Sequence, residues 1–177
     1  MVNLRAEWNA TSLPSAVVPS AIGPELATEA RARLERADYT RYALLDRGNY
    51  DEVKSPREPE LIAALAGIAE AVTGRSLEVA EVRALRLLPG DYVLVRHDRV
   101  HEGRPVELVL DLSAQSIPDA EVHYRHRGQV FFVFPSTPGA LALVERGPTV
   151  MSNHTYVSKL HAGASVVRLI ILLHERP

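Results

Sequence analysis

Two histidines and one arginine in the second half of the chain have the types and order that metal and anion chemistry requires. His97 ends an alternating apolar stretch over 91–97, and His154 lies in a second such stretch over 149–157. Arg168 follows inside a third apolar stretch. Imidazole binds most divalent transition metals, and guanidinium binds carboxylates through two parallel hydrogen bonds. This order therefore predicts a metal site with an anionic co-substrate beside it.

The alternation along these stretches indicates which way the side chains point. Side chains two residues apart share one face of a strand, so His97 shares a face with Val95. Arg168 in the same way shares a face with Ile170. An arginine among apolar neighbours on a core strand is costly unless it is paired, and no acidic residue precedes Glu175 in that stretch. A bound carboxylate is therefore the predicted partner of Arg168.

An iron site with two histidines usually also has a carboxylate, which we expect two residues after the first histidine. Arg99 occupies that position, and none of the seven histidines is followed at this spacing by Asp or Glu. Three alternatives stay open. A bulge after His97 would turn Asp98 inward as the oxygen ligand. Alternatively, Glu102 or His101 would reach back to the metal from the following loop. In the third alternative, the site binds a metal through two histidines plus water or halide, or it binds no metal.

Composition limits the class of protein. The 177 residues, with a net charge of −2 and 46% hydrophobic residues, are typical of one globular domain. The chain has no excess of basic residues, so a nucleic-acid partner is not predicted. No apolar run reaches the roughly 18 residues that a membrane span needs. Cysteine is absent, which excludes disulfides and thiolate ligands. The first residues lack the apolar core of a signal peptide, so a cytoplasmic location is predicted. The oligomeric state is not indicated.

The hydrophobic periodicity changes near residue 76. Before it, helical spacing predicts helices over 24–37 and 58–74, with one short strand over 42–45 between them. After it, a period of two predicts short strands separated by Pro and Gly. These strands are 77–88, 91–97, 106–112, 120–126, 129–134, 140–145, 149–158 and 165–173.

This arrangement predicts a mainly β fold with flanking helices. Short strands at such spacing are typical of a jelly roll, and here the helices would pack outside it. We expect a cupin-like β core over 77–177 and an N-terminal helical support region over 1–76, together forming one compact domain.

The second half resembles the double-stranded β-helix of the 2-oxoglutarate/Fe(II)-dependent oxygenases, particularly the prolyl 4-hydroxylase-like branch. The stretch LLPGDYVLVRHD over 87–98 resembles that branch's approach to its first metal histidine, including the Gly-Asp turn. The stretch 138–143 resembles the turn and strand before the distal histidine. The stretch 154–168 resembles the distal segment, in which a histidine is followed by a glycine and then an arginine. The resemblance covers roughly residues 77–173.

The resemblance implies Fe(II) and 2-oxoglutarate as cofactors. His97 and His154 would be metal ligands, with Asp98 as the candidate oxygen ligand. Arg168 would bind the distal carboxylate of 2-oxoglutarate, and Tyr92 is a further candidate for the co-substrate pocket. The implied activity is hydroxylation or another oxidation of an amino acid, a small metabolite or a peptide side chain. The alternative is a cupin-like jelly-roll protein that binds a small molecule through Arg168 without redox activity.

Overall fold

Strands dominate the computed structural model, which describes residues 2–95 and 106–176. The helices of this described part are α1 (Val2–Asn9), α2 (Pro24–Glu35) and α3 (Pro59–Thr73). The strands are β1 (Ser15–Val18), β2 (Thr40–Leu44), β3 (Gly48–Lys54), β4 (Leu77–Leu87), β5 (Tyr92–Val93), β6 (Val106–Asp111), β7 (Glu121–His126), β8 (Gln129–Pro135), β9 (Leu141–Glu145), β10 (Val150–His154) and β11 (Val166–Glu175).

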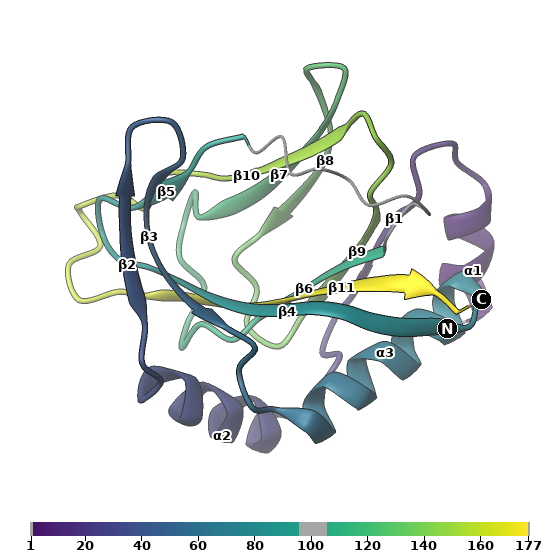
Figure 1. The fold of residues 1–177 in the computed structure, drawn as a ribbon, viewed down its shortest axis with the longest axis horizontal. Coiled ribbons are helices and arrows are strands. Elements are labelled where there is room, and N and C mark those ends of the chain that lie inside the picture. Colours follow the sequence, from purple (N-terminus) through teal and green to yellow (C-terminus); the bar gives the residue numbers. More distant parts are fainter. Residues whose placement is uncertain (1, 96–105, 177) are drawn as a thin grey trace.

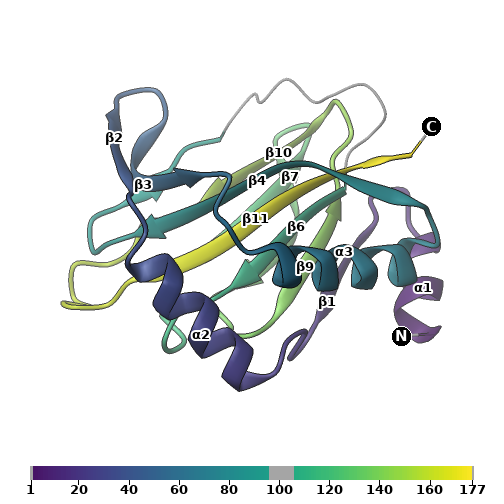
Figure 2. The same ribbon diagram turned by 60° about the horizontal axis from the view of Figure 1, so that its bottom comes forward.

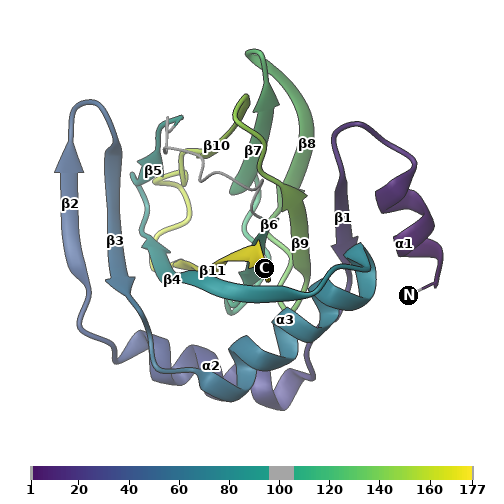
Figure 3. The ribbon, with the colours of Figure 1, turned by 45° about the vertical axis from the view of Figure 1, so that its right-hand side comes forward.

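The strands form one antiparallel sheet that curls into a barrel. Its order is β1-β9-β6-β11-β4-β3-β5-β10-β7-β8, and β2 pairs with β3 beside this path. In Figure 1, β4, β6, β9 and β11 make the lower layer, while β5, β7, β8 and β10 lie opposite them. Helices α2 and α3 cross the outer face of the lower layer (Figure 2). The view in Figure 3 shows strands of both layers surrounding the barrel interior. This is the predicted double-stranded β-helix, so the predicted fold class is confirmed.

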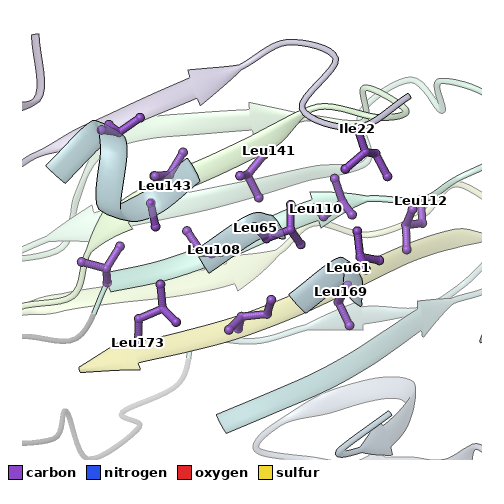
Figure 4. Packing of buried hydrophobic residues seen from close by; sticks show 14 of the residues in the cluster. Ile22, Leu61, Leu65, Leu108, Leu110, Leu112, Leu141, Leu143, Leu169 and Leu173 are labelled. Carbon is purple, nitrogen blue, oxygen red and sulfur yellow. The ribbon is translucent and has the colours of Figure 1, made fainter. Parts of the chain in front are cut away.

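Strands β6 and β11 are buried on both faces, because helices cover one face and the barrel encloses the other. Their helix-facing side chains pack with α3 in a continuous apolar core (Figure 4). The labelled members of this core are Ile22, Leu61, Leu65, Leu108, Leu110, Leu112, Leu141, Leu143, Leu169 and Leu173. The alternate side chains, such as Val109 and Ile170, belong to a second cluster inside the barrel. The polar side chains of the same parity therefore point into the barrel as well.

Helix α3 follows from its sequence pattern. Pro59 suits the first turn, and Leu61 and Leu65 belong to the apolar stripe that faces the sheet. Gly74 ends the helix in the left-handed conformation, with its N–H donating to the carbonyl of Glu70. Among the described residues, no helix is long and apolar enough to cross a membrane.

The first 76 residues contribute more strand than the sequence pattern predicted. One short strand was expected there, but β1, β2 and β3 are all present, and α1 precedes them. Strand β1 extends the sheet beside β9, and β3 pairs with both β4 and β5. The N-terminal region is therefore part of the barrel sheet as well as its helical support.

Of the strand predicted over 91–97, only residues 91–95 lie in the described part of the chain. Its described part pairs only at Tyr92 and Val93, where β5 fits between β3 and β10. Gly48 of β3 lies so close to this strand that a Cβ would come within 2.3 Å of the Tyr92 carbonyl oxygen. The turn before β5 is held by Asp91, whose buried carboxylate accepts two hydrogen bonds of 2.6 Å from Arg41. The entry to β5 is thus fixed by close contacts with the β2–β3 hairpin.

Candidate functional site

His154 lies at the end of β10 and faces the barrel interior. Buried and half-exposed residues alternate along this strand, and Val150, Ser152 and His154 are its buried members. His154 is paired with Val93 of β5, and its side chain is only 5% exposed. The predicted inward direction of His154 therefore agrees with its burial.

Arg168 reaches His154 from the opposite wall of the barrel. It lies on β11, is 1% exposed, and shares its parity with the interior residues Val166 and Ile170. Its Nη1 donates to Nδ1 of His154 at 2.7 Å, and its Nη2 donates to the carbonyl oxygen of Ala120 at 2.7 Å. The structure therefore brings together two of the residues that the sequence singled out, across the interior seen in Figure 3.

The guanidinium of Arg168 is incompletely satisfied. Its Nε is buried without a hydrogen-bond partner among the described residues, and both of its hydrogen bonds go to uncharged acceptors. Asp111 is its cross-strand neighbour, but the Asp111 oxygens accept from the backbone N–H groups of Ser113 and Thr137. Burial lowers the pKa of Arg168, and the nearby Asp111 charge opposes that shift. Because arginine stays protonated in proteins, a charge is buried here without a bonded counter-ion among the described residues.

The contact with Arg168 fixes the hydrogen-bonding state of His154. A guanidinium has only donors, so Nδ1 of His154 must be the acceptor. A neutral imidazole that accepts at Nδ1 carries its hydrogen on Nε2. The arrangement in the structure is therefore the Nε2–H tautomer of His154.

A second polar group lies beside Arg168 inside the barrel. The Tyr124 hydroxyl donates to Glu107 at 2.6 Å, and Arg146 donates to the same carboxylate and to Ser152. Burial raises the pKa of Tyr124 well above 10, and the negative charge of Glu107 raises it further. These residues were missed by the sequence analysis. The usable signal was Glu107, an acid inside the apolar run of β6 with the same parity as Asp111.

A surface pocket of about 290 Å³ adjoins His154. It is lined by Tyr92, Val93, Leu94, Val95, Arg125, Asn153, His154, Thr155 and Tyr156. Val93 belongs to the interior cluster, so its strand neighbour Tyr92 faces the other side of the sheet from Arg168. Tyr92 thus lies near the predicted site but on a different face of the sheet from Arg168.

The remaining predicted site residues lie outside the described part of the chain. These are His97 and Asp98, together with Arg99, His101 and Glu102 from the alternatives. Within residues 2–95 and 106–176, no group of three or more His, Asp or Glu side chains could hold a metal ion. The described site therefore consists of His154, Arg168 and the polar group around Tyr124.

Several solved structures are similar to this chain in fold. A prolyl-4-hydroxylase from Pseudomonas putida superposes with a TM-score of 0.74 at 16% identity, over 98% of this chain and 100% of the other. A 2OG-Fe(II) oxygenase family oxidoreductase from Burkholderia pseudomallei gives 0.75 at 11% identity, over 99% and 91%. HygX from Streptomyces hygroscopicus, with nickel, 2-oxoglutarate and hygromycin B bound, gives 0.71 at 14% identity, over 99% and 87%.

Sequence comparisons add no closer relative. No protein-family model matches the chain, and no curated protein matches it. At identities this low, the structural similarity establishes the fold. The activity has to be argued from the site itself.

The described residues fit a carboxylate ligand better than a metal ion. A buried guanidinium with an unpaired Nε and only neutral acceptors would be completed by a carboxylate. In contrast, a histidine that binds a metal almost always donates from its other ring nitrogen to an acceptor. Nδ1 of His154 instead meets a donor, so His154 as it stands does not fit a metal.

Proposed function

We propose that the protein is a 2-oxoglutarate- and Fe(II)-dependent oxygenase that oxidises an amino acid, a small metabolite or a peptide side chain. The observation that carries the proposal is the Arg168 guanidinium, which is buried inside the barrel and has no hydrogen-bond partner for its Nε among the described residues. Support comes from the shared fold, since the similar structures include a prolyl-4-hydroxylase and HygX, which has nickel and 2-oxoglutarate bound. In this function Fe(II) and 2-oxoglutarate together supply the activation of dioxygen.

The task of Arg168 in this function is to bind and orient the distal carboxylate of 2-oxoglutarate. The Ala120 carbonyl holds Nη2, which sets the plane of the guanidinium fork. Asp111 makes no hydrogen bond to the guanidinium among the described residues; its two oxygens accept from backbone N–H groups instead. The apolar neighbours Val166 and Ile170 exclude water, which strengthens a charged hydrogen bond.

Anaerobic addition of Fe(II) to the protein with 2-oxoglutarate tests the proposal. We expect a weak visible charge-transfer absorption band, and succinate formation once oxygen is admitted. His154→Ala should abolish both signals. His126→Ala is the matched control, because Nδ1 of His126 contacts only the Thr149 hydroxyl at 3.0 Å and belongs to an exposed pair. Absence of the band and of retained iron in the wild-type protein would refute the oxygenase.

One observation favours the second function, a cupin-like protein that binds a small carboxylate without redox activity. The Arg168 guanidinium donates to Nδ1 of His154, and such a contact is expected in an anion-binding site that holds no metal. Metal analysis separates the two functions. A protein that binds dicarboxylates by calorimetry but retains no Fe(II), Mn(II) or Zn(II) when they are present would be such a binding module.

A further inference from the structure

The hydrogen bond between Arg168 and His154 also determines which nitrogen of the imidazole carries the hydrogen. We infer that Arg168 is also a positioning residue, which holds His154 in the Nε2–H tautomer and keeps it from binding a metal until a carboxylate draws the guanidinium away. This inference rests on the proposed function and deepens it. It predicts that the anionic co-substrate and the metal bind cooperatively.

The position of the hydrogen on the His154 imidazole determines which ring nitrogen can bind a metal. A metal can bind Nε2 of a neutral imidazole only after the hydrogen there has moved to Nδ1. That hydrogen would then point at the N–H of Arg168, with the two nitrogens 2.7 Å apart. Two donors cannot share this contact, so the Arg168–His154 bond has to break when a metal binds.

Breaking that bond without a replacement is costly. The guanidinium already has one unpaired buried nitrogen, Nε, and losing His154 would leave Nη1 unpaired as well. Its cross-strand neighbour Asp111 forms no hydrogen bond with the guanidinium among the described residues, and its oxygens accept from the backbone N–H groups of Ser113 and Thr137. An incoming carboxylate supplies the missing acceptors. Each ligand therefore favours the state that the other needs, which is a reciprocal coupling between two sites.

The tautomer of His154 can be measured without any metal. Long-range ¹⁵N–¹H NMR of the imidazole nitrogens distinguishes the two neutral forms, and His154→Gln identifies the signals of His154. We expect the wild-type protein to show the Nε2–H form, and saturating glutarate to increase the Nδ1–H form. Glutarate has two carboxylates and lacks the keto group with which 2-oxoglutarate would chelate a metal. A wild-type His154 that carries its hydrogen on Nδ1 overturns the inference, and so does a tautomer that glutarate leaves unchanged.

Metal affinity gives the second measurement. Arg168→Met removes the donor, so Mn(II) binding measured by calorimetry without any carboxylate should strengthen at least tenfold, about 1.4 kcal/mol. Glutarate should strengthen Mn(II) binding to the wild-type protein by a similar factor and leave Arg168→Met unchanged. An apolar replacement of a buried cation is usually tolerated, so this variant should fold.

Arg125→Met is the control for charge alone. Arg125 lines the pocket beside His154, but its Nε donates to Asn153 and not to the imidazole. If this variant strengthens Mn(II) binding as much as Arg168→Met, repulsion between charges explains the result and the positioning role is wrong. If no protein binds Mn(II) with or without glutarate, the proposed oxygenase itself fails, whatever the tautomer of His154.

Discussion

Removing the Tyr124 hydroxyl should measurably destabilise the barrel. This hydroxyl is fully buried and donates to Glu107 at 2.6 Å, so Tyr124→Phe leaves one carboxylate oxygen without that donor. Hydrogen bonds to charged groups contribute about 1.5–3 kcal/mol, and both partners here are desolvated. For a chain of this size, each kcal/mol corresponds to roughly 2–4 °C in Tm, so the expected fall is roughly 3–12 °C.

Urea denaturation followed by circular dichroism would measure the change in the free energy of unfolding. Tyr156→Phe is the matched control, because Tyr156 is 48% exposed and its loss should change stability by less than about 0.5 kcal/mol. If Tyr124→Phe costs no more than this control, the hydroxyl does not stabilise Glu107. The account of the buried polar group would then be wrong.

The same variant makes a prediction about alkaline pH. The pKa of Tyr124 is raised above 10 in the folded protein by burial and by Glu107, so the folded state holds this proton more tightly than the unfolded state. Its contribution to stability is complete below pH 10 and is lost as pH rises from 10 toward the folded pKa. Tyr39, raised to about 12, acts in the same direction in both proteins. The wild-type protein should therefore lose more stability above pH 10 than Tyr124→Phe does.

Three further predictions concern the site and its support. Arg168→Lys keeps the charge but loses the two parallel donors of the guanidinium, so the affinity for 2-oxoglutarate measured by calorimetry should fall tenfold or more. An unchanged affinity would contradict the carboxylate-binding role of Arg168. Asp98→Ala should weaken Mn(II) binding at least tenfold, with Glu102→Ala as the control. If only Glu102→Ala weakens Mn(II) binding, Glu102 and not Asp98 is the oxygen ligand. Arg41→Met should lower the free energy of unfolding, measured by urea denaturation, by roughly 1–2 kcal/mol. This value lies between those of exposed and buried ion pairs, because Arg41 is half-exposed in its pair with Asp91; an unchanged free energy would mean that Asp91 does not need this partner.

Alternation made the direction of the key side chains predictable. His154 lies on a strand where every second residue is buried, and Arg168 lies on a strand that is buried on both faces. Both point inward, and Arg168 shares its parity with the interior residues Val166 and Ile170. The contact between them was not predictable, because it crosses the barrel. Which atoms meet there depends on the curvature of a sheet in which β3, β4 and β5 lie between the two strands.

The local sequence pattern did not predict the extent of strands whose pairing depends on tertiary contacts. The stretch 91–97 alternates well, yet the described β5 is limited to Tyr92 and Val93 by its neighbours and by the clamped turn at Asp91. Tyr92 was expected near the co-substrate, but the burial of Val93 shows that Tyr92 faces the other side of the sheet. Strand β1 was missed, and its pairing partner β9 lies far along the chain. Strand β3 was also missed, although it pairs with the preceding β2 as well as with β4.

The position of β11 also determines when the site can exist during synthesis. This strand lies between β4 and β6, although the ribosome makes it after both of them. Until it arrives, β4 and β6 each keep an open edge that another chain could pair with. The same strand brings Arg168, so closure of the barrel and completion of the proposed carboxylate site happen in one late step. Binding of a dicarboxylate would therefore report that a newly made chain has finished folding.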